Sequence, residues 1–66
     1  MKNNLRVERA ILNITQADLA EKVSVSRQTI NAIESNKYVP STVLALKIAA
    51  VCKKRVEDIF LLENTD

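Results

Sequence analysis

The chain contains no glycine, and its single proline is Pro40. Turns that need a positive φ must therefore be made by residues such as asparagine, which adopts this conformation less readily than glycine. The usual breaks between elements are missing, so the ends of helices have to be read from the residues that cap them. Read in this way, the sequence predicts one compact all-α domain of five short helices over residues 1–66.

Asparagine and threonine mark the first two helices. Asn3 or Asn4 can cap the first helix, and Asn13 can end it in a left-handed conformation. The apolar residues of this helix are Leu5, Val7, Ala10, Ile11 and Leu12. Thr15 is a strong N-cap for the second helix, in which Asp18 lies near the positive end of the helix dipole.

Serines begin the third and fourth helices. Ser26 caps a helix over residues 27–34, which Asn36 can stop with a positive φ. Ser41 caps the fourth helix, whose apolar residues recur at spacings of three and four and form one core stripe. These are Leu44, Ala45, Ile48, Ala49 and Cys52. After a loop, the sequence VEDIF at 56–60 predicts a short fifth helix.

The composition excludes several classes of site. Cys52 is the only cysteine and histidine is absent, so we expect neither a disulfide within the chain nor a zinc site. No other cofactor is indicated. We do not expect an enzyme, because there is no phosphate-binding glycine loop and no acid pair in an evident cleft. Cys52 lies on the core stripe, where a thiol is expected to be buried rather than reactive.

The sequence favours a soluble, cytoplasmic protein with no membrane partner. Residues 43–52 form the longest apolar run, interrupted by Lys47, and they are too few to span a bilayer. Residues 1–10 lack the apolar region of a secretory signal.

Charge is distributed unevenly although the net charge is only +2. Residues 22–55 carry seven basic residues against Glu34 alone, whereas residues 56–66 carry four acidic residues and no basic one. A basic centre suggests a polyanion as the partner of the middle of the chain. Taken alone this signal is weak, because lysines are also ordinary solvated surface.

The second and third helices are joined only by the sequence VSVS at 23–26. Such a short joint forces two helices to cross steeply, as in a helix-turn-helix, whose second helix enters the DNA major groove by its N-terminal end. In the third helix Ile30 and Ile33 are expected to face the core, and the other residues are mostly polar. A polar outward face is normal for any exposed helix, but here it follows a capped helix and a tight joint.

Three polar residues of the third helix are expected to read bases. Arg27 and Gln28 stand at its start, and Asn31 follows one turn later on the same face. Arginine matches guanine O6 and N7, and glutamine matches adenine N6 and N7, each through two parallel hydrogen bonds. The expected partner is therefore double-stranded DNA.

Residues 15–41, TQADLAEKVSVSRQTINAIESNKYVPS, resemble the helix-turn-helix of the Cro/C1-type, or Xre-family, bacterial and phage repressors. The sequence LALKIAAVCKKRVEDIF matches the fourth and fifth helices of the family, so the resemblance covers nearly the whole chain. The chain length and the string SRQTI…NKYxPS further resemble minimal stand-alone members, which bind palindromic operators as homodimers. In such members the chain ends can pair as a short antiparallel β-ribbon, here over roughly residues 1–4 and 60–63.

The resemblance implies roles for particular residues. Arg27 and Gln28 match base-reading positions. Gln16 matches a residue that contacts a DNA phosphate and braces the glutamine of the recognition helix, here Gln28. Ala32 matches a position where some members carry another base-reading residue, so part of the readout is expected to shift to Asn31.

Phosphate contacts are implied at both ends of the recognition helix. Ser26 or Thr29 can reach a phosphate near its start. The loop that grips phosphates after the helix is matched by Asn36, Lys37 and Tyr38. Simpler readings remain open at this point, because Lys37 can be plain surface and Thr29 can pair with its own helix backbone.

Two further features follow from the resemblance. Arg9 and Glu34 match a buried ion pair that ties the first helix to the third. Family members often place glycine at the ends of the first and third helices and in the joint, where this chain has Asn13, Asn36 and Ser24. Asparagine tolerates the left-handed region well, whereas Ser24 is expected to store about 1 kcal/mol of strain.

Spare apolar residues predict a homodimer. Val43, Leu46, Ala50 and Val51 lie off the core stripe of the fourth helix. Four consecutive apolar residues near the C-terminus exceed what one small core is expected to absorb, and they are assigned to the dimer interface: Ile59, Phe60, Leu61 and Leu62. The alternative is that Ile59 and Leu62 simply cap the core. The acidic residues 57–66 are then expected to face away from DNA.

The function predicted from these residues is a sequence-specific transcriptional regulator, and we expect a repressor. Two alternatives stay open: an antitoxin that also binds a toxin protein, and a module that binds only protein. Arg27 and Gln28 favour DNA over both. No pocket for a small-molecule inducer is evident from the sequence.

Overall fold

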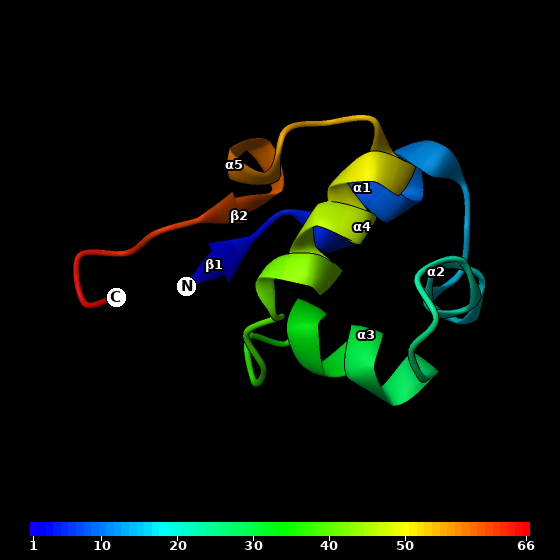
Figure 1. Ribbon diagram of the computed structural model, residues 1–66, viewed down its shortest axis with the longest axis horizontal. Coiled ribbons are helices and arrows are strands. Elements are labelled where there is room, and N and C mark those ends of the chain that lie inside the picture. Colours follow the sequence, from blue (N-terminus) through cyan, green and yellow to red (C-terminus); the bar gives the residue numbers. More distant parts are fainter.

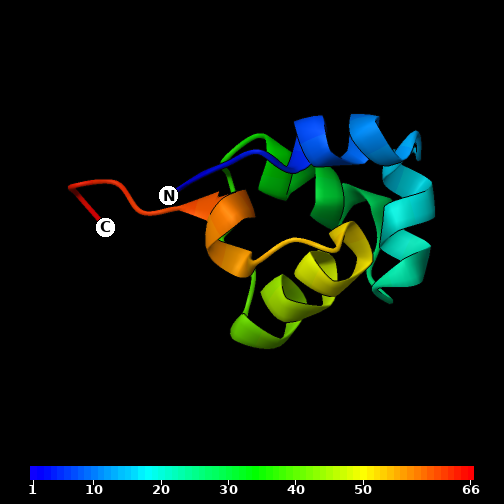
Figure 2. The same cartoon turned by 90° about the horizontal axis from the view of Figure 1, so that it is seen from above.

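The computed structural model describes residues 1–66 and contains five helices and a two-stranded sheet, which confirms the expected fold class. The elements in chain order are β1 (Lys2–Asn3), α1 (Leu5–Leu12), α2 (Gln16–Lys22), α3 (Arg27–Glu34), α4 (Thr42–Cys52), α5 (Val56–Ile59) and β2 (Phe60–Leu61) (Figure 1). No helix is both long and apolar enough to cross a membrane. In both views α2 lies at the end of the molecule opposite to the ribbon and the chain ends (Figures 1 and 2).

The capping pattern of the sequence explains where the central helices begin. Thr15 and Asp18 form a capping box, in which each side chain accepts a hydrogen bond from the backbone N–H of the other at 3.0 Å. Ser26 and Ser41 begin α3 and α4 by accepting, at 3.2 Å, from the backbone N–H three residues later. The N-cap position of α1 is Asn4, but the side chain that bonds there is Asn3, which accepts from the N–H of Leu5 at 3.1 Å.

Four residues other than glycine adopt positive φ and end or connect helices. Asn13, Ser24 and Asn36 do so at φ 57°, 61° and 60°, as the sequence predicted. The fourth is Lys53, which ends α4 at φ 56°. Nothing in the sequence indicated this conformation for Lys53, because lysine has no special tolerance for the left-handed region.

The chain ends pair as the expected antiparallel ribbon, with Lys2 opposite Leu61 and Asn3 opposite Phe60. Each strand has two residues, so the ribbon is shorter than expected. The fifth helix is also shorter, because it ends at Ile59 and Phe60 is already extended at φ −109° and ψ 123°.

Twelve apolar residues form the core at the centre of the helices. The stripe predicted for α4 is buried at Leu44, Ile48, Ala49 and Cys52, and Ala45 packs against it. Burial raises the pKa of the Cys52 thiol, as expected for a thiol within a core. On α1, by contrast, Val7 and Ile11 are exposed.

Residues 59–62, expected at a dimer interface, divide into two buried and two exposed residues. Ile59 and Phe60 are 0% and 8% exposed and belong to the core. The helical turn ends at Ile59, and from Phe60 the extended chain alternates its side chains between inside and outside. Leu61 is therefore turned to the surface. Leu62 lies beyond the end of β2 and does not cap the core, because it is 84% exposed.

Candidate nucleic-acid interface

Helix α3 divides cleanly into a buried and an exposed face. Ile30 and Ile33 are completely buried, and they hold the helix against the core. Arg27, Gln28 and Asn31 are all exposed, as predicted for residues that reach a ligand outside the protein. The two isoleucines thus anchor a helix whose polar face remains available.

The joint between α2 and α3 is held by backbone hydrogen bonds. The N–H of Val25 donates to the carbonyl of Ala20 at 3.0 Å, and that of Ser24 donates to Glu21 at 3.3 Å. Ser24 adopts the left-handed conformation that many family members leave to glycine. Val23 is buried beneath the joint, so α2 and α3 pack directly against one another.

A buried carboxylate ties α3 to α1. The Glu34 side chain is 0% exposed and accepts two hydrogen bonds from Arg9, from Nε to Oε2 at 2.8 Å and from Nη2 to Oε1 at 3.2 Å. Arg9 also donates from Nη1 to the carbonyl of Ile14 at 3.0 Å. The ion pair implied by the resemblance is therefore confirmed, and its fork-like geometry is the strong kind.

The hydrogen bonds keep Glu34 ionised. Burial acts to raise the pKa of Glu34, but the bonds from Arg9 and Gln16 outweigh this effect and the pKa lies below its usual value. The carboxylate in turn raises the pKa of the Arg9 guanidinium. Glu34 is consequently a permanent hydrogen-bond acceptor at neutral pH.

Gln16 does not brace Gln28, in contrast to the expectation. Its Nε2 donates to Glu34 Oε1 at 3.0 Å and to Asn31 Oδ1 at 3.3 Å, and its Oε1 accepts from Arg27 Nη1 at 3.4 Å. The ionised carboxylate attracts the amide N–H toward α3, and this leaves Gln28 without a side-chain partner from α2. Two of the three expected base-reading residues are therefore linked through Gln16.

Ser26 and Thr29, both expected at a phosphate, bond to one another. Their hydroxyl oxygens are 3.0 Å apart, and Ser26 also accepts from the N–H of Thr29. Thr29 thus pairs with the cap of its own helix rather than with the helix backbone.

The end of α3 and the loop after it are held by Asn3, a contact that the sequence did not indicate. Asn3 of β1 donates from Nδ2 to the carbonyl of Ile33 at 2.9 Å and to Asn36 Oδ1 at 3.1 Å. Lys37 and Tyr38, which follow, are exposed. The sequence indicated Asn3 only as a possible cap of α1, and no local pattern could reveal a bond to a residue 30 positions away.

Arg27, Lys37 and Lys47 form no salt bridge, in contrast to Lys54 and Arg55. Near the C-terminus, Arg55 pairs with Asp58 at 3.2 Å and Lys54 lies 3.8 Å from Glu8. No carboxylate forms a salt bridge with Arg27, Lys37 or Lys47. These three cationic side chains are therefore free to meet phosphates.

Comparison with known proteins agrees with this geometry. A family model described as helix-turn-helix matches residues 5–59. An uncharacterized HTH-type transcriptional regulator of Methanocaldococcus jannaschii is 54% identical over 66 residues, which cover 100% of both chains. A regulator of the same description from Bacillus subtilis is 48% identical over 64 residues, or 97% of each chain.

This chain belongs to the Cro/C1-type helix-turn-helix family. A third relative, from Methanothermobacter thermautotrophicus, is 47% identical over 65 residues and carries the same description. The chain is accordingly a DNA-binding protein of transcription regulation.

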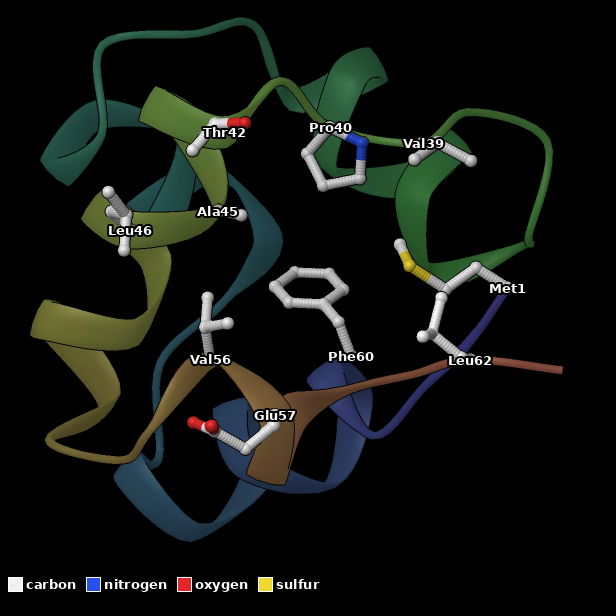
Figure 3. A pocket seen from close by; sticks show the side chains of 10 residues that line it. All are labelled: Met1, Val39, Pro40, Thr42, Ala45, Leu46, Val56, Glu57, Phe60 and Leu62. Atoms are coloured by element: carbon white, nitrogen blue, oxygen red, sulfur yellow. The ribbon is translucent and has the colours of Figure 1, made fainter. Parts of the chain in front are cut away.

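This helix-turn-helix protein also has an open apolar groove of about 340 Å³ on its surface. It lies between the start of α4, the segment before it, α5 and β2, and Phe60 forms its floor (Figure 3). Val39, Leu46 and Leu62 on its walls are all more than half exposed. The α5 and β2 elements that line it lie on the side of the molecule away from α2 (Figure 1).

Proposed function

We propose that this protein is a transcriptional repressor that binds a palindromic operator as a homodimer, with the N-terminal end of α3 in the major groove. The observation that carries this proposal is the exposed polar face of α3, with Arg27 and Gln28 at the start of the helix. A major groove admits one α-helix, and these two side chains match the edges of guanine and adenine. Asn31 extends the same face by one turn.

The phosphate contacts are proposed at either end of this reading face. Gln16, Ser26 and Thr29 lie near the start of α3, and Asn36, Lys37 and Tyr38 follow its end. Contacts at both ends would fix the register of the helix in the groove, which is what phosphate contacts contribute to recognition. A protein held in this way blocks the DNA to other proteins, and this is the physical basis of repression.

The homodimer is proposed because one recognition helix reads only a few base pairs. Two-fold pairing places two such helices about 34 Å apart on one face of the DNA. We place the interface at the apolar groove, because Val39, Leu46 and Leu62 offer exposed apolar surface there. Leu62 is the most exposed apolar side chain and can enter the groove of a second copy.

Substitutions in α3 test the proposal. Arg27→Ala or Gln28→Ala should each weaken binding to the specific operator by about 1–3 kcal/mol and relax base choice at one position. Arg55→Ala is the matched control, because it removes a cationic side chain outside the helix-turn-helix. Fluorescence anisotropy with operator DNA measures both. Unchanged affinity in Arg27→Ala and Gln28→Ala would refute the assignment of these readers.

A toxin-binding relative of the same fold would behave differently during purification. It would co-purify with a second protein, and its gel-filtration mass would exceed that of a homodimer. The repressor proposed here elutes as twice its 7.4 kDa without such a partner.

A further inference from the structure

We infer that Gln16 fixes which end of the Asn31 side-chain amide faces the DNA, and thereby determines which bases Asn31 accepts. The inference rests on the proposed function, because it requires α3 to read bases in the major groove. It assigns the Gln16 side chain as a positioning residue for specificity. The phosphate contact proposed for this residue then falls to its backbone N–H, because both N–H groups of the side-chain amide are engaged within the protein.

The amide of Gln16 has only one satisfactory orientation. Its Nε2 lies 3.0 Å from Glu34 Oε1, and its Oε1 lies 3.4 Å from Arg27 Nη1. A carboxylate only accepts hydrogen bonds and a guanidinium only donates them. A reversed amide would place oxygen against the carboxylate and an NH₂ group against the guanidinium, so the buried Glu34 determines the polarity of Gln16.

Gln16 in turn determines the orientation of the Asn31 side-chain amide. The second N–H of Gln16 Nε2 points to Asn31 Oδ1 at 3.3 Å. A reversed Asn31 would set one NH₂ group against another, and both can only donate. Asn31 Nδ2 donates to no group of the protein, and the residue is exposed. The atom of Asn31 that remains free for DNA is therefore a hydrogen-bond donor.

A fixed donor discriminates among bases. In the major groove guanine presents N7 and O6, thymine O4 and adenine N7 as acceptors, whereas cytosine presents only its N4 amino donor. Asn31 held by Gln16 should therefore disfavour cytosine as the contacted base. An asparagine without this restraint could turn Oδ1 toward cytosine N4, and discrimination would be lost.

Selection from random-sequence DNA tests this inference with four proteins. They are the parent, Asn31→Ala, Gln16→Met, and the double variant. The position at which Asn31→Ala removes base preference identifies the contacted base. We expect the parent to disfavour cytosine there by about 5- to 150-fold, the range for one mismatched base pair. Gln16→Met retains a long side chain without a donor or acceptor, and it should reduce this discrimination at least about fivefold.

The double variant separates positioning from general damage. At the contacted position, Gln16→Met should change nothing further in the Asn31→Ala background, whereas a structural defect would alter all positions in both backgrounds. Urea denaturation of each variant establishes that it is folded, and Gln16→Ala replaces Gln16→Met if that variant does not fold.

Three results would overturn the inference. They are a parent that prefers cytosine at the contacted position, an Asn31→Ala variant that loses preference nowhere, and a folded Gln16→Met variant with unchanged discrimination. Failure of the proposed function looks different, since the parent itself would then enrich no sequence.

Discussion

Ser24 adopts φ 61° in the joint that sets the position of the recognition helix. A side chain with a Cβ carries a cost of about 1–2 kcal/mol in this region, and glycine avoids it at the expense of a more flexible unfolded chain. Asn13 has nearly the same φ of 57°, but asparagine accommodates this conformation better. The two residues therefore offer a matched comparison of the cost of the left-handed conformation.

Replacing Ser24 by glycine should stabilise the protein. Ser24→Gly is expected to raise the free energy of unfolding by about 0.5–1 kcal/mol, because the relief of strain exceeds the entropic loss. Asn13→Gly should change it by less than half as much. Urea denaturation of both variants measures the difference, and equal effects would show that Ser24 is not strained.

Lys37 follows the recognition helix, and its charge has no acidic partner. Lys37→Ala should weaken binding to every DNA sequence and make the slope of log K against log salt shallower by about one unit. Lys54→Ala is the control, because Lys54 lies beside Glu8 and outside the helix-turn-helix. Titrations at several salt concentrations give both slopes. An unchanged slope in Lys37→Ala would remove this residue from the phosphate contacts.

At the scale of elements, Glu34 connects three helices. It accepts from Arg9 of α1 and from Gln16 of α2, and it lies at the end of α3 itself. The Glu34 side chain is fully buried, and that of Arg9 is only partly exposed. Breaking such a pair leaves one charge poorly solvated, which makes the loss larger than the gain from forming the pair.

Glu34→Gln should lower the free energy of unfolding by about 2–3 kcal/mol at neutral pH. We expect less than the roughly 3–5 kcal/mol typical of completely buried pairs, because Arg9 is partly exposed. Because the pKa of Glu34 is depressed in the folded protein, its contribution is present above the unfolded pKa of about 4.3 and is lost as the pH falls through the folded pKa. The parent should therefore lose more stability than Glu34→Gln on acidification below about pH 4.

Denaturation curves from pH 7 to pH 3 test this prediction. Glu21→Gln provides the control, because Glu21 is exposed and has no salt bridge, and it should retain the pH dependence of the parent. Identical pH profiles for the parent and Glu34→Gln would show that the ion pair does not contribute to stability.

The elements differ in how far the sequence alone could predict them. Thr15, Ser26 and Ser41 bond within three residues of their own position, so local chemistry was sufficient to place α2, α3 and α4. The partners of Asn3 and Gln16 lie on other elements and depend on the tertiary arrangement. Arg9 and Glu34 were found only because the sequence resembles a family whose members join these positions.

The same limit applies to apolar residues at the surface. The spacing in α1 does not reveal that Val7 and Ile11 are exposed whereas Glu8 is buried. Near the C-terminus, the change from helix to strand at Phe60 decided which side chains enter the core, and four adjacent apolar residues gave no sign of it.

At the scale of the whole molecule, the groove between α4, α5 and β2 is the proposed dimer interface. A charge placed there should prevent association. Leu46→Glu is expected to shift the sedimentation-equilibrium mass from twice 7.4 kDa to the monomer and to weaken operator binding. Ile11→Glu is the matched control, because it places the same charge on an exposed apolar residue of α1, outside the groove.

A monomeric parent, or dissociation caused by Ile11→Glu and not by Leu46→Glu, would contradict this interface. The position of the groove relative to α3 also matters for DNA binding. A two-fold axis through the groove and perpendicular to the DNA would bring the two copies of α3 onto one face of the dimer.

Selection of bound fragments from random DNA, followed by sequencing, tests the central claim most directly. The account predicts two half-sites related by a two-fold axis, with centres about one helical turn or 34 Å apart. It also predicts that Arg27→Ala loses base preference at one symmetric pair of positions. Enrichment of a single asymmetric site, or an unchanged motif in Arg27→Ala, would contradict a dimer that reads DNA through α3.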